Sequence, residues 1–371
     1  MDIVINFLQN NWLDVVRFLV VIGVLILVHE FGHFIVAKLA GVRVLEFALG
    51  FPPKILKFRR GETLYSIGAI IFGGFVRMYG EDQKVTKDVS RSFSNKPTGV
   101  RALIITAGVL MNLLLGVVLF STVYSFTGIP QLIDTGKVTV VDIVQNTPAY
   151  GAGLAAGDII VSIDNQKVSK IDEFKSYVDQ KRGKEIKLET RRKSGESKYI
   201  VLIPRENPPA NEGPLGVAIV DKEITFYFAP LWQRPILGAW YGLKEAISWG
   251  EQTILGTASL FVGIATSGKV PEGAAGPVGI YSITKTVCSD FFSCLRFMGV
   301  ISINLAILNV LPIPPFDGGK LFFVGVEAAF RSRAARVRAK IEQFTTIAGL
   351  VFILWLLISI TMQDISRLIG R

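Results

Sequence analysis

Residues 15–40 read VVRFLVVIGVLILVHEFGHFIVAKLA, an apolar run that leads into two histidines and a glutamate. A bilayer-spanning helix needs roughly 20 mostly apolar residues, because every backbone polar group must be bonded within the segment. A secretory signal peptide would instead lead into a small-residue cleavage site, so we interpret this stretch as a membrane span. Ionisable groups at membrane depth are energetically costly, and therefore His29, Glu30 and His33 indicate a functional site.

The whole composition is typical of a membrane protein. Of the 371 residues, 50% are hydrophobic and 19% are charged, whereas soluble domains carry about 25% charged residues. Further charge-free runs of spanning length lie at 102–133, 297–316 and 343–363. The sequence therefore predicts a polytopic α-helical membrane protein with four transmembrane helices.

The positive charge of the chain is concentrated in two stretches. Of the formal net charge of +10, residues 43–101 contribute +6 and residues 320–340 contribute +5, whereas residues 128–296 are nearly neutral. Cytoplasmic membrane loops retain Lys and Arg in this way, so the excess predicts the orientation of the loops rather than a nucleic-acid partner. With both basic loops in the cytoplasm, the first and third spans run inward and the other two run outward.

The segment between the second and third spans lies outside the cytoplasm in this topology. Residues 252–268 form a further charge-free run, rich in Thr, Ser and Gly. A full span there would place 320–340 on the opposite side from 43–101, so we interpret the run as an amphipathic helix on the membrane surface. Cys288 and Cys294 either form a local disulfide or remain free thiols, and two cysteines alone make a poor metal site.

The chemistry of the chain is concentrated in the pattern His29-Glu30-x-x-His33, which contains the only two histidines. On a helix, positions four apart project from one face, so both imidazoles can bind one metal ion. Zinc accepts imidazole nitrogen and carboxylate oxygen, and in catalytic sites it keeps one position for water. Glu30 is placed to take a proton from that water. The alternative is a pair of hydrogen-bonded histidines at a helix interface.

A third ligand is expected from the other span that runs inward. Asp317 is the only acidic residue between Arg296 and Glu327, and it lies at the end of the third span. Prolines before it and Gly318-Gly319 after it would break the helix and let the carboxylate turn back toward the metal. The alternative is an aspartate that merely caps a helix.

These residues resemble a known family over essentially the whole chain. The motif HEFGH at 29–33, the segment SINL at 302–305 and the run NVLPIPPFDGG at 309–319 look like those of the site-2 proteases, in their bacterial RseP-like branch. These proteins are intramembrane zinc metalloproteases. The resemblance implies that His29, His33 and Asp317 bind Zn²⁺ and that Glu30 is the catalytic base. It also implies that Asn304 and Asn309 lie near the substrate and in the wall of the active site.

The resemblance further implies an activity and a location. The protein would cleave single-span membrane proteins within or near the bilayer, such as anti-sigma factors or the remnants of signal peptides. Its partners would be these transmembrane substrates and the lipid bilayer. It would be a multi-pass protein of the bacterial inner membrane, with its active site toward the cytoplasm.

Residues 64–78 read as two short apolar strands broken by glycines. A hairpin with an exposed edge can receive an extended peptide by strand addition, and the resemblance implies a membrane-associated β-hairpin here. We expect substrate contacts from Gly73, Gly74, Phe75 and Val76. The alternative is a hairpin with a purely structural role.

Residues 128–206 predict one inserted extracytoplasmic α/β domain, because short apolar strands alternate there with turns. The run GLAAGDII at 153–160 resembles part of a PDZ domain. Its groove would bind a peptide end or act as a size filter, or the domain would be a rigid scaffold without a ligand.

The expected domain layout follows from these segments. In chain order it comprises a first transmembrane helix with the metal motif at 1–43, a cytoplasmic-side loop with the hairpin at 44–101, a second transmembrane helix at 102–127, the PDZ-like domain at 128–206, a linker and interfacial helix at 207–294, a third transmembrane helix at 295–319, a basic cytoplasmic loop at 320–342 and a fourth transmembrane helix at 343–363.

Two competing functions have different requirements. A catalytically silent PDZ adaptor with a structural metal would need four protein ligands, and no fourth is evident beside the three named. A metal transporter would need several intramembrane acidic or histidine sites along a path, whereas the sequence contains one cluster. Both requirements favour the protease.

Overall fold

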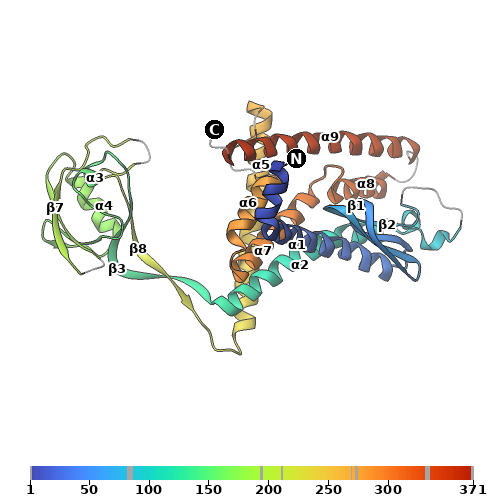
Figure 1. Cartoon of the computed structure of the whole chain (residues 1–371), viewed down its shortest axis with the longest axis horizontal. Coiled ribbons are helices and arrows are strands. Elements are labelled where there is room, and N and C mark those ends of the chain that lie inside the picture. The colour runs from blue at the N-terminus through green and yellow to red at the C-terminus, as the bar shows by residue number, and fades with distance from the viewer. Residues whose placement is uncertain are drawn as a thin grey trace. The chain divides into compact units, whose positions relative to one another are not determined.

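The computed structural model of the chain describes residues 2–81, 87–192, 195–209, 212–268, 270–271, 275–330 and 335–368. The chain forms two compact units, one of Met1–Thr127 with Ala229–Arg371 and the other of Gly128–Phe228. The first unit contains long helices and the hairpin, and the second is a small α/β domain inserted between two of those helices (Figure 1).

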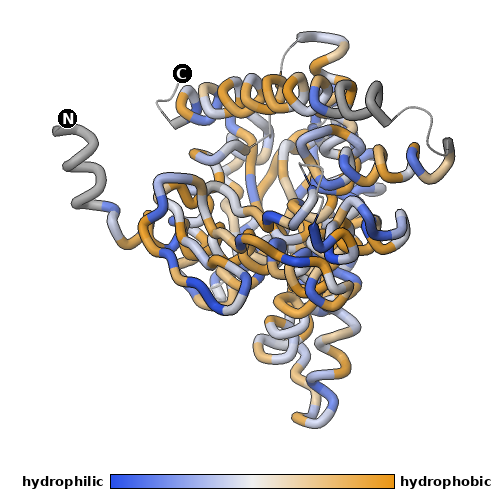
Figure 2. The backbone as a smooth tube through the Cα atoms, turned by 90° about the vertical axis from the view of Figure 1, so that its right-hand side faces the viewer, coloured by the Kyte–Doolittle hydropathy of each residue, from blue (hydrophilic) through white to orange (hydrophobic). Residues whose placement is uncertain are grey.

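Long apolar helices dominate the first unit. They are α1 (Asp2–Leu39), α2 (Thr98–Thr127), α5 (Arg234–Ser267), α6 (Pro277–Val287), α7 (Phe291–Val310), α8 (Asp317–Phe330) and α9 (Ala335–Leu368), with one-turn 3₁₀ helices η1 (Val89–Arg91) and η2 (Phe93–Asn95) before α2. Among the described residues, four stretches are long and apolar enough to cross a membrane, namely Asn11–Leu39, Thr98–Thr127, Phe291–Val310 and Gln343–Arg367. Apolar residues run along these helices (Figure 2). The prediction of four candidate spans is confirmed at this level.

The central helix of the first unit is α2, which packs against α1, α5, α7 and α8. It comes close to α1 at Gly32, where an added Cβ would lie 2.4 Å from the carbonyl oxygen of Ala107. Small residues let apolar helices approach until their backbones are in contact. The added van der Waals contact matters in a bilayer because the hydrophobic effect does not drive helices together there. The two helices are therefore held together at the level of the histidine motif.

The helix expected at 252–268 is longer than predicted and packs along α2. It begins at Arg234, and an added Cβ at Gly238 would lie 2.1 Å from the hydroxyl oxygen of Ser125. The first half was missed because Glu245 interrupts the apolar run. The carboxylate of Glu245 is buried and paired with Arg296 of α7 at 2.7 Å, so the charge is compensated by a partner distant in sequence.

The hairpin is a pair of long bent strands, β1 (Val44–Arg60) and β2 (Thr63–Met78). Residues 44–49 pair with residues 64–67 on one side and with residues 74–78 on the other, while residues 54–60 pair with residues 63–68. The two strands thus form a sheet with four arms, in which 54–60 and 74–78 are the edges. The sequence predicted two separate strands within 64–78, which was wrong: these residues form the single bent strand β2, and its partner β1 was not predicted. The glycines in this stretch are bends within one strand rather than a break, because both arms of β2 pair with the same part of β1 from opposite sides.

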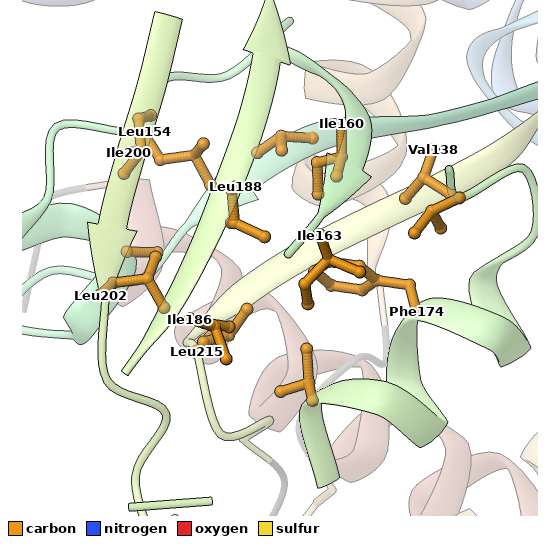
Figure 3. Packing of buried hydrophobic residues seen from close by; sticks show 14 residues of the cluster. Val138, Leu154, Ile160, Ile163, Phe174, Ile186, Leu188, Ile200, Leu202 and Leu215 are labelled. Carbon is orange, nitrogen blue, oxygen red and sulfur yellow. The ribbon is translucent and has the colours of Figure 1, made fainter. Parts of the chain in front are cut away.

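The second unit is a six-stranded antiparallel sheet with two helices. Its elements are β3 (Ile129–Ile143), α3 (Pro148–Gly151), β4 (Ile159–Ile163), β5 (Gln166–Lys167), α4 (Ile171–Gln180), β6 (Ile186–Arg191), β7 (Ser197–Leu202) and β8 (Val217–Tyr227), with strand order β7-β6-β4-β3-β8 and β5 on β4. Buried aliphatic side chains and Phe174 form its core (Figure 3). Because β8 pairs along β3, the domain continues to Phe228, and the expected boundary at 206 is too early. The described parts of the proline-rich stretch, 207–209 and 212–214, lie inside the domain and not in a linker beyond it.

The open alternative for the two cysteines is decided by the structure. Cys288 and Cys294 form a disulfide that joins the end of α6 to the first turn of α7. Between them, the side chain of Asp290 accepts a hydrogen bond from the backbone N–H of Ser293 at 2.8 Å and caps α7. A side-chain oxygen at this position satisfies one of the free N–H groups of the first turn, which explains why α7 begins there.

Candidate metal centre

The two histidines and the aspartate meet at one point. His29 and His33 lie one turn apart on α1, and their Nε2 atoms are 3.2 Å apart. The Oδ2 atom of Asp317 lies 3.1 Å from each of these nitrogens. His33 is buried, and the side chains of His29 and Asp317 are only 12% and 15% exposed. Three potential ligand atoms from positions 284 residues apart in sequence therefore form a nearly equilateral triangle.

The dimensions and chemistry of this triangle fit zinc. Zinc bonds to nitrogen and oxygen ligands measure about 2.0–2.1 Å, so the ligand atoms of a tetrahedral site lie about 3.3 Å apart. The ring of His33 is held in the required tautomer, because its Nδ1 lies 2.8 Å from the carbonyl oxygen of Ile104. A carbonyl only accepts, so Nδ1 carries the proton and Nε2 presents a lone pair toward the triangle.

Asp317 reaches the histidines because the chain turns sharply after α7. That helix ends at Val310, and α8 begins at Asp317 itself. The intervening run is rich in proline, which lacks a backbone N–H and cannot continue a helix. A side chain at Gly318 would collide with the carbonyl oxygens of Val310 and Leu311 at 2.1 and 2.3 Å, so glycine is required for this turn.

Glu30 lies in a cavity together with the three ligand candidates. The cavity has a volume of about 230 Å³ and opens between α1, α8 and the edge arm of β2. An added Cβ at Gly74 would lie 2.8 Å from Cγ of Glu30, so the edge arm passes directly over the glutamate. A strand edge, a carboxylate and the ligand triangle thus share one space.

The structure brings most of the expected substrate contacts to this cavity. Gly74, Phe75, Val76 and Asn309 line it, together with residues of the ligand triangle. Asn304 instead accepts a hydrogen bond from Thr253 of α5, and Gly73 packs against the ring of Phe51. In the described structure, neither Asn304 nor Gly73 lines the cavity. Each contacts a neighbouring helix or strand instead.

Two charged residues of the cavity were not anticipated from the sequence. Lys320, one turn after Asp317, donates a hydrogen bond of 3.0 Å to Glu81, which follows β2. Partial burial lowers the pKa of Lys320, but the carboxylates of Glu81 and Asp317 raise it more, so the pKa lies above its ordinary value. This pair ties α8 to the end of the edge arm. No local pattern relates residues 81 and 320, which only the fold brings together.

Three residues of α2 that contact the site were not among the expected site residues. Ile104, Gly108 and Asn112 recur every four positions, and all three face the imidazoles. The available signal was Asn112 itself, a polar side chain in a charge-free span, since such groups are usually functional.

Comparisons with known proteins identify the family of the chain. The model of Peptidase family M50 matches residues 17–356. Zinc metalloprotease RasP of Oceanobacillus iheyensis is 31% identical, covering 95% of this chain and 99% of the relative. A putative zinc metalloprotease of Clostridium acetobutylicum is 33% identical, covering 96% and 98%, and one of Clostridium perfringens is 30% identical, covering 94% and 97%. The chain therefore belongs to peptidase family M50, the site-2 proteases, and is a zinc metalloprotease.

Proposed function

We propose that this protease cleaves single-span membrane proteins within or near the bilayer, with His29, His33 and Asp317 as the ligands of its zinc ion and Glu30 as the catalytic base. The observation that carries the proposal is the convergence of three ligand atoms at 3.1–3.2 Å beside Glu30 in one cavity. Among the described residues the cluster offers three ligands, and a catalytic zinc site uses three and leaves one position open. A structural metal in a silent adaptor would need a fourth.

The chemistry divides between the metal and the chain. When bound, zinc acts as a Lewis acid that polarises a peptide carbonyl and lowers the pKa of water. Glu30 accepts the proton of the attacking water and delivers it to the leaving amide nitrogen. The helices around Glu30 exclude bulk water, and the ligand triangle determines where the scissile peptide must lie relative to its carboxylate.

The edge arm at 74–78 supports an extended mode of substrate binding. A peptide bond inside a helix is shielded by its own turn, so the substrate must be extended before the carbonyl is accessible. An edge strand offers free main-chain N–H and C=O groups, and an added strand satisfies them. Phe75 and Val76 line the same cavity and provide apolar contacts for side chains that leave the bilayer.

The proposed orientation follows from charge and from the disulfide. The basic stretches at 43–101 and 320–340 lie on the cytoplasmic side of a bacterial inner membrane, and the metal centre lies toward that side. The disulfide of Cys288 and Cys294 supports an extracytoplasmic position for the end of α6. The substrates are membrane-anchored regulators such as anti-sigma factors, or the remnants of signal peptides.

The α/β domain is proposed to be PDZ-like and to lie outside the cytoplasm. A small cavity of about 70 Å³ lies between α4 and the start of β8, where apolar residues from both elements face each other. Because β8 is an edge strand, a peptide end can add beside it with one apolar side chain in this cavity. The domain would then select substrates whose outer part has been trimmed.

The test uses the purified full chain in detergent with a model single-span substrate. Glu30→Gln should retain zinc and lose cleavage, because the amide cannot accept the proton. Glu173→Gln, an exposed change on α4, serves as the control and should cleave normally. A substrate with helix-breaking residues at the cleavage region should be cut faster than one with a stabilised helix. Wild-type cleavage by Glu30→Gln would refute the assignment of the base.

A further inference from the structure

One face of α2 forms the back wall of the metal centre. Ile104 accepts a hydrogen bond from Nδ1 of His33 at 2.8 Å. At Gly108 an added Cβ would lie 2.3 Å from Nε2 of His33 and 2.8 Å from Cε1 of His29. One turn further, the side-chain amide nitrogen of Asn112 lies 3.4 Å from Nδ1 of His29. Each imidazole therefore has one α2 group behind it.

The side chain of Asn112 is unusual in its surroundings. The residue is fully buried, and in the described structure its Oδ1 atom has no hydrogen-bond partner. A buried amide oxygen without a partner is costly, because it has lost its water and gained nothing in return. The assignment of oxygen and nitrogen in an Asn side chain follows from its hydrogen bonds, since the two atoms have nearly the same size.

The requirements of the metal decide between the two amide orientations. A neutral imidazole has one N–H and one lone pair. If Nε2 of His29 faces a metal, its Nδ1 must carry the proton, and this N–H would then point at the NH₂ group of Asn112. Rotating the amide by 180° instead presents Oδ1, which accepts the proton and removes the clash between two donors.

We propose that Asn112 is a positioning residue of the metal centre, whose Oδ1 accepts the Nδ1–H of His29 and holds the ring with Nε2 toward the zinc. The proposal rests on the ligand set of the proposed function. It assigns to Asn112 the role for His29 that the carbonyl of Ile104 has for His33.

The backbone at Asn112 is itself held in place. Ser302 of α7 donates a buried hydrogen bond of 2.7 Å to the carbonyl oxygen of Asn112. Since α7 also leads into the turn that carries Asp317, this bond couples the spacing of α2 and α7 to the position of the third ligand. The amide is therefore presented to His29 from a braced backbone.

The experiment measures zinc affinity of the purified full chain in detergent by competition with a chromophoric chelator. Asn112→Leu should weaken binding 10–100-fold, the range typical of lost outer-shell partners. Asn112→Asp should stay within a few fold of wild type, because a carboxylate oxygen also accepts from Nδ1–H. Ser125→Ala, which removes a hydroxyl from the same helix away from the site, should leave the affinity unchanged.

A second readout separates positioning from packing. In cobalt-loaded protein, Asn112→Leu should alter the visible absorption spectrum, and Asn112→Asp should restore it. Wild-type zinc affinity in the leucine variant would overturn the proposal, and so would equal weakening in both variants. If the leucine variant does not fold, Asn112→Ala replaces it under the same criteria. His29→Ala is the reference: zinc retained by it would refute the ligand set itself, which is a separate failure.

Discussion

At the scale of single residues, the metal centre depends on space as much as on ligands. The two imidazoles are pressed against α2, and Gly108 is the position where they touch it. No other residue type leaves room there, because the first side-chain carbon would overlap the ligand nitrogen of His33. The absence of a side chain is thus as necessary to the site as the presence of Asp317.

Replacing Gly108 by Ala should separate metal binding from helix stability. Alanine favours helix over glycine by about 1 kcal/mol, yet its methyl group would displace the ring of His33. We expect zinc affinity to fall at least about 10-fold, the lower end of the range for changes to residues that surround metal ligands. Circular dichroism should show no loss of helical content. Gly325→Ala in α8, where an added Cβ meets nothing within 4 Å, is the matched control. Normal zinc affinity in Gly108→Ala would contradict the packing described.

At the scale of elements, the hairpin must be anchored if its edge arm is to stay over Glu30. Glu62, in the turn between β1 and β2, accepts a hydrogen bond from Lys38 at 2.8 Å and two from Arg91 at 2.7 and 2.8 Å. These contacts tie the turn to the end of α1 and to η1. Such partly exposed ion pairs contribute about 1 kcal/mol or less each to stability, so breaking these contacts costs little free energy.

The anchor predicts a pH dependence. The largest influence on the pKa of Glu62 is the hydrogen bond from Lys38, which lowers it. Partial burial raises the pKa and Arg91 lowers it further, so the pKa lies below its ordinary value of 4.5. The stabilisation is therefore complete above this ordinary value and is lost as the pH falls through the lowered pKa. Acidification should increase proteolysis in the hairpin of the wild-type protein.

The variant Glu62→Gln tests this origin. It should be cleaved faster than wild type at neutral pH, and most of the acid-induced increase in hairpin proteolysis should disappear. An acid-stable zinc-independent protease with mapped cleavage sites provides the measurement. If hairpin proteolysis depends on pH in Glu62→Gln as it does in the wild type, other carboxylates cause the dependence.

At the scale of the whole molecule, the two units have separate cores. The α/β domain has its own cluster of buried side chains, and its ends leave side by side because Ile129 pairs with Tyr227. The ligand candidates all belong to the helical unit. Each unit therefore carries the interactions that its own fold requires.

Two fragments test this division. Residues 128–228 should unfold cooperatively by circular dichroism when expressed alone, whereas residues 128–206 should not, because they lack β8 and the buried Leu215. Conversely, a chain in which a short Gly-Ser linker joins Gly128 to Phe228 should still bind zinc. Cooperative unfolding of the shorter fragment would show that β8 is dispensable to the core.

Local patterns were sufficient for the features that depend on local physics. Length and hydropathy predicted the four candidate spans, and the spacing of His29 and His33 follows from helical geometry alone. Part of β3 and the strands β4, β6 and β7 of the second unit were also indicated, as short apolar runs between turns. β8 was missed because a proline-rich loop separates it from the rest and its partner β3 lies at the other end of the domain.

The amino-acid sequence alone was enough to establish the family, the enzyme class, the metal and the apolar segments, because each depends on residues close together in the chain or on motifs matched one by one. Only the tertiary structure decided which side chains surround the ligands. Helix packing brings Asn112 to His29, and helix packing and strand pairing bring Lys320 and the edge arm at 74–78 to the cavity. Those contacts are made over long sequence separations, and close packing rather than any local preference determines them.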